Sequence, residues 1–211
     1  MTVKLLCLDA DGTVFNTMPV LEQLAVYLMG AYGLPRAQLS RLYVETAGLP
    51  FLDQLEQLFL RNGHNALVAG TFEKHKNLLV LREKTVFADA VKLLERCRTV
   101  FGLSCALVSS TRRQLVNSLV NLNGLADLFE WTGGIEFGCK TRQLQRLTEV
   151  FKLEPTELLF VGDSPMDSNF SAGADVPFVG LVRDERHVSR FNLLVPQHNL
   201  IFNLSQLEKF L

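Results

Sequence analysis

Four short apolar runs, each followed by polar or turn-forming residues, constrain the fold of this chain more than any other feature. They span residues 4–8, 104–108, 158–161 and 177–182. Each has the length of a β-strand and is rich in Val, Leu or Phe without clean alternation, which is typical of parallel strands covered on both faces. Segments with helical periodicity separate the later runs, such as the one with Leu115, Leu119 and Leu122. This alternation predicts an α/β fold with an open, doubly wound parallel sheet.

The stretch from residue 18 to residue 84 has a different pattern. Apolar residues recur there at helical spacing, as in Leu21, Leu24 and Leu28, and no strand pattern lies between them. Two Gly-Leu-Pro triplets interrupt the periodicity and favour several short helices. The sequence therefore predicts an all-helical insertion after the first strand.

These patterns divide the chain into two domains. We predict an α/β core domain formed by residues 1–17 and 85–211, and a helical domain over 18–84. Within the core domain, we expect a helix over 86–100 and a last strand and helix over 195–211.

The composition argues against several kinds of partner. The chain has 211 residues and a formal net charge of −1, so it produces no overall field that would attract nucleic acid or an anionic membrane. No apolar run approaches the ~20 residues of a membrane-spanning helix, and the first run is too short and too closely followed by acidic residues for a secretory signal. We expect a cytoplasmic monomer or homodimer that binds neither nucleic acid nor a membrane.

Cysteine and histidine spacings indicate neither a disulfide framework nor a zinc site. The four cysteines lack Cys-x-x-Cys spacing, and Cys7 and Cys105 lie inside apolar runs, where a thiol packs as a small hydrophobe. This pattern is typical of a reducing compartment. The histidines lack zinc-ligand spacing, and we expect all four at the surface: His64, His75, His187 and His198.

Two carboxylates stand at the end of the first apolar run, in Asp9-Ala10-Asp11-Gly12-Thr13. Residues i and i+2 of a strand point to the same side, so Asp9 and Asp11 are expected to converge on one point, and Gly12 permits a sharp turn beyond them. Like charges this close need a cation, a shared proton or open water. The simpler interpretation is an ordinary turn after a strand.

Three further polar clusters follow in the chain. Ser109-Ser110-Thr111 comes directly after the second run, Lys140 lies near the start of a predicted helix, and Gly162-Asp163-Ser164-Pro165-Met166-Asp167 follows the third run. Hydroxyl and N–H groups at such a position bind anions, and carboxylate oxygens suit Mg²⁺. Taken singly, each has a simpler interpretation: a helix N-cap, a solvated lysine and a turn.

The combination favours function over four unrelated turns. Each cluster lies at or near the carboxyl end of a predicted parallel strand, which is where open α/β sheets bind ligands. Two acidic pairs, a hydroxyl and a lysine at one sheet edge indicate a metal-assisted active site.

On these four clusters the chain resembles the phosphatase branch of the haloacid dehalogenase-like (HAD) superfamily, nearest to its phosphoglycolate phosphatase-like and β-phosphoglucomutase-like members. The resemblance covers essentially the whole chain. It implies a Rossmann-like core and identifies the helical insertion with that family's cap. The chain departs from the family pattern at Asn16-Thr17, where an acidic residue often precedes Ser or Thr, and at Thr141, where proline is common after the lysine.

The resemblance implies an enzyme that hydrolyses a small phosphorylated metabolite with Mg²⁺. Asp9 is then the nucleophile that forms an aspartyl-phosphate, and Asp11 is the general acid and base. Asp9, Asp163 and the backbone carbonyl of Asp11 hold the metal, and Asp167 completes or orients its ligand shell.

The remaining implied roles concern the phosphoryl group. Ser109 and the Ser110 N–H hold phosphoryl oxygens, and Lys140 balances the charge of the nucleophile and the phosphate. The cap supplies specificity through the loop 46–50. Basic residues of the cap are candidates for contact with an anionic leaving group, although solvated positions suit most of them: Arg36, Arg41, Lys74, Lys76 and Arg82.

Three other functions stay open to different degrees. A sugar-phosphate phosphomutase of the same superfamily fits the same residues, since the choice depends on how the cap excludes water. A non-catalytic binding protein on this fold is disfavoured because all four clusters are intact. A dehalogenase is disfavoured because the family's dehalogenases lack an acid at the position of Asp11.

Overall fold

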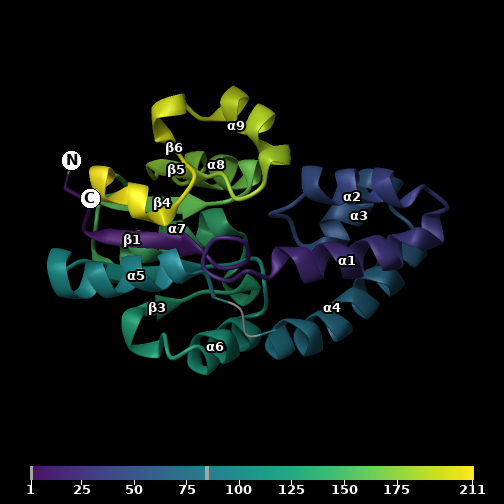
Figure 1. Cartoon of the computed structure of the whole chain (residues 1–211), viewed down its shortest axis with the longest axis horizontal. Helices are drawn as coiled ribbons and strands as arrows, with labels where there is room; N and C mark the ends of the chain where they lie inside the picture. Colours follow the sequence, from purple (N-terminus) through teal and green to yellow (C-terminus); the bar gives the residue numbers. More distant parts are fainter. Residues whose placement is uncertain (1, 84–85) are drawn as a thin grey trace. The chain divides into compact units, whose positions relative to one another are not determined.

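The computed structural model of the chain describes residues 2–83 and 86–211 (Figure 1). Its contacts divide the chain into two compact units, one of Met1–Asn16 with Thr85–Leu211 and the other of Thr17–Lys84. The second domain boundary that we predict, between Lys84 and Thr85, lies outside the described residues. The two units are considered separately below.

The first unit is built on a parallel sheet. Its six strands in the described part of the chain have the order β3-β2-β1-β4-β5-β6. They are β1 (Leu5–Asp9), β2 (Ser104–Val108), β3 (Trp131–Thr132), β4 (Leu158–Gly162), β5 (Phe178–Leu181) and β6 (Leu200–Ile201). The chain order reverses beside β1, which lies between β2 and β4. The carboxyl ends of these three strands therefore meet at a topological switch point, where this kind of sheet binds ligands.

Both faces of the central strand are buried, which explains its continuous apolar sequence. On one face, Leu144 and Leu147 of helix α7 (Lys140–Phe151) pack in a cluster with Leu5. On the other face, Leu6 and Leu8 are equally buried. The predicted α/β sheet is confirmed.

The remaining helices of this unit follow the strands in sequence. They are α5 (Ala88–Arg96), α6 (Arg113–Leu122), α8 (Pro165–Ala172) and α9 (Val188–Leu194). The expected helix over 86–100 is α5 followed by a π-helix, Cys97–Phe101. Strand β3 was not predicted, because two residues are too few to show any periodicity. In the C-terminal segment, β6 precedes a 3-10 helix, Leu204–Phe210.

All the regular secondary structure of residues 17–83 is helical, which confirms the predicted helical insertion. Its helices are α1 (Met18–Met29), α2 (Arg36–Glu45), α3 (Phe51–Phe59) and α4 (Gly63–Glu83). Pro35 and Pro50 stand directly before α2 and α3, where the fixed φ of proline suits a helix start. Helix α4 has 21 residues and is longer than the short helices that we expected. Gly70 alone does not break it, since glycine costs a helix only about 1 kcal/mol.

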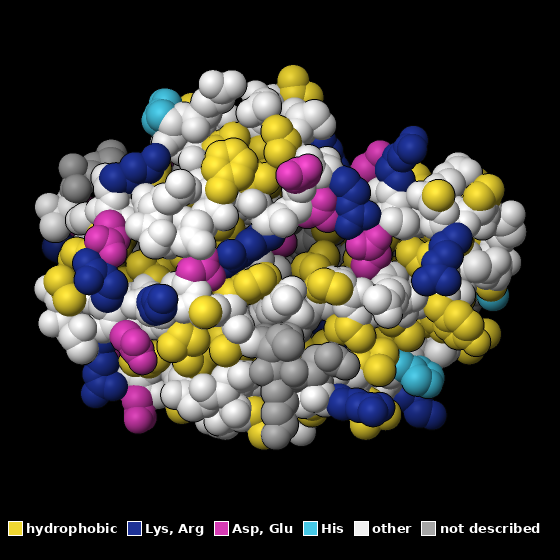
Figure 2. Space-filling model, in the orientation of Figure 1, with side chains coloured by type: hydrophobic (Ala, Val, Ile, Leu, Met, Phe, Trp, Pro, Cys, Tyr) yellow, Lys and Arg dark blue, Asp and Glu magenta, His cyan; other side chains and the backbone are white. Residues whose placement is uncertain are grey.

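The surface carries charges of both signs. On the face shown in Figure 2, Lys and Arg side chains lie among Asp and Glu side chains, as the formal net charge of −1 suggests. None of the helices formed by the described residues has the length and hydropathy needed to span a membrane.

Candidate active site

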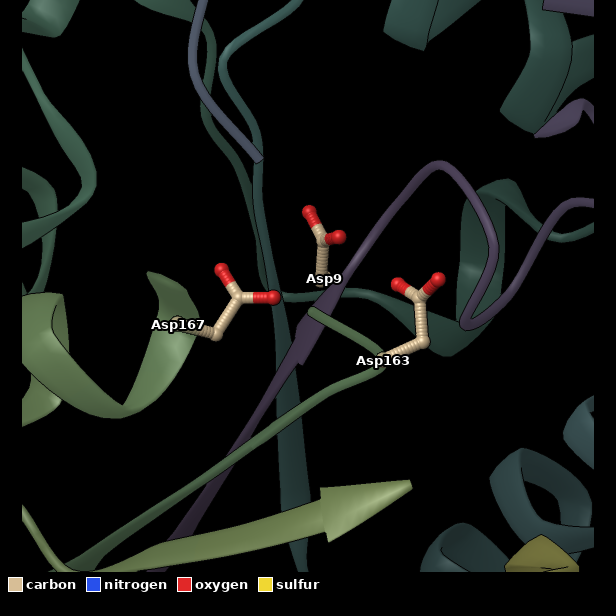
Figure 3. A group of neighbouring side chains, drawn as sticks. All are labelled: Asp9, Asp163 and Asp167. Carbon is tan, nitrogen blue, oxygen red and sulfur yellow. The ribbon is translucent and has the colours of Figure 1, made fainter. Parts of the chain in front are cut away.

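Three aspartates from two parts of the chain meet at the carboxyl edge of the sheet (Figure 3). Asp9 is the last residue of β1, Asp163 follows β4, and Asp167 lies in the first turn of α8. One carboxylate oxygen from each lies within 4.8 Å of the others. All three residues are at most 5% exposed, so water does little to screen their mutual repulsion.

Local structure fixes the two aspartates that follow β4. A capping box begins α8: the Ser164 side chain accepts the Asp167 N–H, and the Asp167 carboxylate accepts the Ser164 N–H at 3.2 Å. A Cβ at Gly162 would collide with the Asp167 carboxylate. Glycine at the end of β4 therefore leaves the space that Asp167 occupies.

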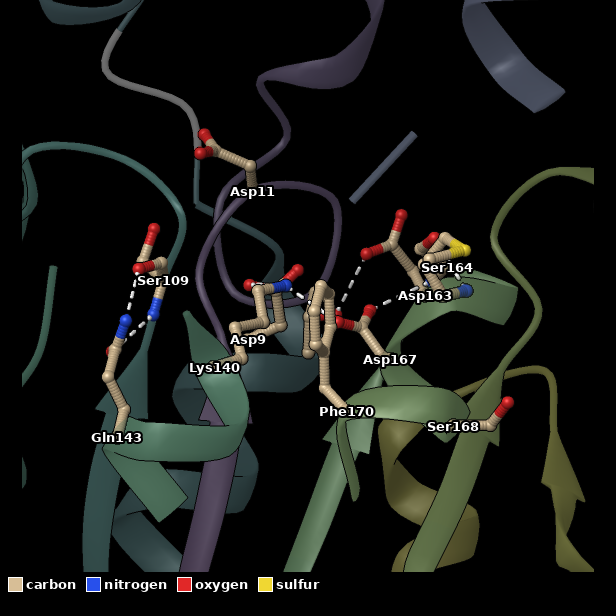
Figure 4. Close-up of polar contacts among 12 residues, drawn as sticks. Asp9, Asp11, Ser109, Lys140, Gln143, Asp163, Ser164, Asp167, Ser168 and Phe170 are labelled. Carbon is tan, nitrogen blue, oxygen red and sulfur yellow. Dashed lines mark hydrogen bonds and ion pairs between the residues drawn. The ribbon is translucent and has the colours of Figure 1, made fainter. Parts of the chain in front are cut away.

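Lys140 lies between two of the carboxylates (Figure 4). Its Nζ is 2.7 Å from Asp9 Oδ1 and 2.7 Å from Asp167 Oδ1. Lys140 is the first residue of α7, and its side chain is 2% exposed. The alternative interpretation of Lys140 as a solvated lysine is therefore wrong.

The electrostatics of this cluster favour a cation. Burial raises the pKa of Asp9 to about 7 against the opposing charge of Lys140, and Asp167 adds to the rise. Burial, then Asp9 and Asp167, also raise the pKa of Asp163 well above its usual range. Burial alone would lower the pKa of Lys140, but the two carboxylates beside it outweigh that effect and raise it. One lysine does not neutralise three carboxylates, and their hard oxygen atoms fit Mg²⁺.

The side chain of Asp11 does not join these carboxylates, contrary to the expected convergence with Asp9. Strand β1 ends at Asp9, and a tight turn follows, in which Gly12 has a φ of 84°. The alternation of a strand therefore does not extend to Asp11. The Thr111 hydroxyl donates a hydrogen bond of 2.7 Å to Asp11 Oδ2, and in Figure 4 the carboxylate points away from Asp9.

The same turn brings Gly12 and Thr13 against Asp163. The Thr13 hydroxyl donates to Asp163 Oδ1 at 3.2 Å, and a Cβ at Gly12 would collide with the Asp163 carboxylate. Sequence reasoning gave Thr13 no role, because the partner of its hydroxyl is 150 residues away.

Ser109, at the end of β2, is held by groups that were not predicted. Its Oγ accepts the Thr111 N–H at 3.0 Å. The side-chain amide of Gln143 accepts the Ser109 N–H at 3.2 Å and donates to the Ser109 carbonyl at 2.8 Å. The simpler interpretation, that Ser109 and Ser110 cap the next helix, is wrong, because the N-cap of α6 is Arg112. Ser110 is half-buried beside Ser109.

Gln143 was missed although one signal for it was available. It lies three residues after Lys140, and residues at this spacing share a face of a helix. Both side chains are buried, and Gln143 also donates to the Gly138 carbonyl at 3.0 Å.

The expectation that all four histidines lie at the surface is wrong for His187. This residue is 3% exposed, and its Nδ1 is 3.0 Å from the Asp163 carbonyl oxygen. Its ring packs edge-on against Phe191. An apolar neighbour and a backbone partner 24 residues away bury it, and neither appears as a local pattern in the sequence.

In the helical unit, side chains brace the loop 46–50. The Thr46 hydroxyl donates to Gln54 Oε1 at 2.9 Å, and Gln54 Nε2 donates to the Leu49 carbonyl at 2.9 Å. Among the basic candidates of this unit, Lys76 is buried. The other four are exposed, as solvated positions require: Arg36, Arg41, Lys74 and Arg82.

Comparison with known proteins gives a consistent result. The family model for haloacid dehalogenase-like hydrolases matches residues 6–181. A phosphoglycolate phosphatase of Thiobacillus denitrificans is 27% identical over 192 residues, which cover 84% of this chain and 82% of that protein.

Two solved structures share the fold over nearly the whole chain. A haloacid dehalogenase-like family hydrolase from Streptococcus pneumoniae has a TM-score of 0.83 at 11% identity, covering 99% of this chain and 98% of that one. A HAD-superfamily hydrolase of subfamily IA from Geobacter sulfurreducens has a TM-score of 0.63 at 17% identity, with coverages of 99% and 96%.

Proposed function

The chain belongs to the haloacid dehalogenase-like hydrolase family, and within it we propose a Mg²⁺-dependent phosphatase that hydrolyses a small phosphate monoester through an aspartyl-phosphate. One observation carries this proposal. Three buried carboxylates lie together, and the Nζ of a buried lysine is 2.7 Å from two of them, Asp9 and Asp167. The membership confirms the family and the hydrolase that the four sequence clusters indicated.

In the first step, Asp9 is the nucleophile. One of its oxygens forms a bond to phosphorus, and the bond from phosphorus to the ester oxygen breaks with its electron pair going to that oxygen. Asp11 donates a proton to the departing oxygen, so the alcohol leaves neutral. Lys140 stabilises negative charge at Asp9 and on the phosphoryl group.

In the second step, water restores the enzyme. Asp11, now a carboxylate, takes a proton from water as the water oxygen bonds to phosphorus. The bond between phosphorus and Asp9 then breaks, which releases phosphate and returns both aspartates to their starting protonation states. The net reaction is ester plus water giving alcohol plus phosphate.

The cation site of this proposal consists of oxygen ligands alone. Asp9 and Asp163 would hold Mg²⁺ together with the backbone carbonyl of Asp11, and Asp167 would complete or orient the shell. Bound Mg²⁺ supplies the positive charge that offsets repulsion between the Asp9 carboxylate and a phosphate dianion.

The phosphoryl oxygens would be held beside the cation site. Because Ser109 Oγ accepts the Thr111 N–H, its own proton is directed elsewhere, and we assign it to a phosphoryl oxygen. The Ser110 N–H would bind a second oxygen. The helical unit would act as the cap, and the similarity to a phosphoglycolate phosphatase supports a small phosphorylated metabolite as the substrate.

Phosphate release from a panel of small esters tests the proposal, with and without Mg²⁺. Turnover that needs Mg²⁺ and is lost in Asp9→Asn supports it. The exposed Asp127, changed to Asn, is the matched control and should leave turnover within about twofold of wild type. Phosphate release by Asp9→Asn at the wild-type rate would overturn the proposed nucleophile, and phosphoryl transfer between sugar phosphates without release would favour a mutase.

A further inference from the structure

Thr111 connects two residues that the proposed reaction uses. Its backbone N–H donates to Ser109 Oγ at 3.0 Å, and its hydroxyl donates to Asp11 Oδ2 at 2.7 Å. The residue is 4% exposed, so bulk water has little access to either bond. Thr111 therefore contacts both the Ser109 hydroxyl, which we assign to the phosphoryl group, and the Asp11 carboxylate, which we assign to proton transfer.

A backbone hydrogen bond of Thr111 helps to hold its loop. The carbonyl oxygen of Thr111 accepts the Ile135 N–H at 3.0 Å, and this backbone bond does not depend on the side chain. Helix α6 begins after Arg112, so the Thr111 side chain does not cap it. The hydroxyl of Thr111 instead reaches Asp11 Oδ2, at 2.7 Å.

The location of Asp11 makes such a bond consequential. Asp11 lies beyond the end of β1 and outside the carboxylate cluster, where the strand no longer fixes its side chain. A general acid must reach the leaving oxygen within hydrogen-bond distance, and a misplacement of ~1 Å can cost about 100-fold in rate.

We propose that Thr111 is the positioning residue of Asp11, holding its carboxylate at a set place relative to the phosphoryl group bound by Ser109. This inference rests on the proposed function, because it presumes that Asp11 transfers the proton. It gives a role to Thr111, to which we had assigned none although it belongs to the Ser109-Ser110-Thr111 cluster.

Two substrates with different leaving groups distinguish a role in positioning Asp11 from a merely structural role of Thr111. The phenolate of para-nitrophenyl phosphate departs without a proton, whereas the alkoxide of an alkyl phosphate needs one. The ratio kcat/KM reports steps up to release of the alcohol, so it isolates the first proton transfer from the later hydrolysis. We expect Thr111→Val to lower kcat/KM for alkyl phosphate about 10-fold or more and for para-nitrophenyl phosphate about twofold or less.

Two further variants complete the experiment. Thr111→Ser keeps the hydroxyl and should restore most of the alkyl phosphate kcat/KM. In an Asp11→Asn background, Thr111→Val should have little additional effect, because the carboxylate that it positions is gone.

Each outcome has a definite meaning. Equal losses for both esters in Thr111→Val, or no loss for either, would overturn the role of Thr111. If Asp11→Asn itself affected both esters equally, the proposed role of Asp11 as the acid would fail, and the inference on Thr111 with it. A leaving-group effect in Asp11→Asn but not in Thr111→Val would reject only the present inference.

Discussion

The side-chain amide of Gln143 pairs with both backbone polar groups of Ser109, donating to the carbonyl at 2.8 Å and accepting the N–H at 3.2 Å. This is the pattern by which a neighbouring strand would hold the same residue. Gln143 lies one turn after Lys140 on α7, and Lys140 contacts Asp9. Helix α7 therefore ties the end of β2 to the end of β1, and with them the proposed phosphoryl site to the proposed nucleophile.

Removal of the Gln143 amide should weaken the phosphoryl site. In Gln143→Leu, the Ser109 N–H and carbonyl lose their partners in a buried site, at a cost of about 1–3 kcal/mol. We expect the inhibition constant of inorganic phosphate to rise about 10-fold, since Ser109 is no longer fixed. Gln145→Leu, at an exposed position of the same helix, should leave that constant unchanged. An unchanged constant in Gln143→Leu would show that Ser109 keeps its place without the amide.

Replacement of Lys140 should affect both turnover and stability. Lys140→Met leaves Asp9 and Asp167 buried without their cation, and breaking a buried pair in this way costs about 3–5 kcal/mol. We expect loss of measurable turnover and a lower free energy of unfolding in urea. The control is Lys4→Met, which removes an ion pair of 2.6 Å to Glu157 from a side chain that is 55% exposed. That change should cost about 1 kcal/mol or less, and an equal loss in both variants would contradict the role of burial.

Removal of one carboxylate should stabilise the metal-free protein. Because burial, Asp9 and Asp167 disfavour the charged form of Asp163, Asp163→Asn relieves repulsion on the order of 1 kcal/mol, which corresponds to about 2–4 °C in Tm for a chain of this size. We expect Mg²⁺ to raise the Tm of the wild type, and Asp163→Asn should lose this rise. Asp127→Asn should change neither quantity. A lower metal-free Tm in Asp163→Asn would mean that its bond from Thr13 outweighs the repulsion.

The sequence could predict the site residues whose positions the strands of the sheet determine. Apolar runs located β1, β2 and β4. Asp9 at the end of β1 and Asp163 directly after β4 meet because parallel strands end at one edge of the sheet. The expected convergence of the Asp11 and Asp9 side chains was wrong because the position of Asp11 depends on a turn. Gln143 and His187 depend on partners 34 and 24 residues away, and no local periodicity records such contacts.

Acid should reduce the stability that Asp89 contributes. Burial alone would raise the pKa of Asp89, but hydrogen bonds from Arg183 at 2.8 Å and from the Leu204 N–H at 2.9 Å outweigh it and lower the pKa. A carboxyl whose folded pKa is depressed stabilises the fold fully above its unfolded value of about 3.9, and this contribution is lost as the pH falls through the lower folded value.

Asp89→Asn tests this dependence by urea unfolding at neutral pH and at a pH below the unfolded pKa. The variant should be less stable than wild type at neutral pH, and the difference should narrow in acid. A difference of the same size at both pH values would assign the loss to the packing of asparagine rather than to the carboxylate charge.

A methyl group at Gly12 should displace Asp163 and thereby weaken the cation site. Gly12 has a φ of 84°, and the added Cβ would collide with the Asp163 carboxylate. The matched control is Gly124→Ala, which has a similar φ of 68° but open space around the Cβ. Both variants bear the strain of a left-handed alanine, roughly 1–2 kcal/mol, so both should lower Tm. Only Gly12→Ala should raise the Mg²⁺ concentration needed for half-maximal turnover, by about 10-fold or more. If the two variants needed the same Mg²⁺ concentration, Asp163 would not be a ligand of the cation.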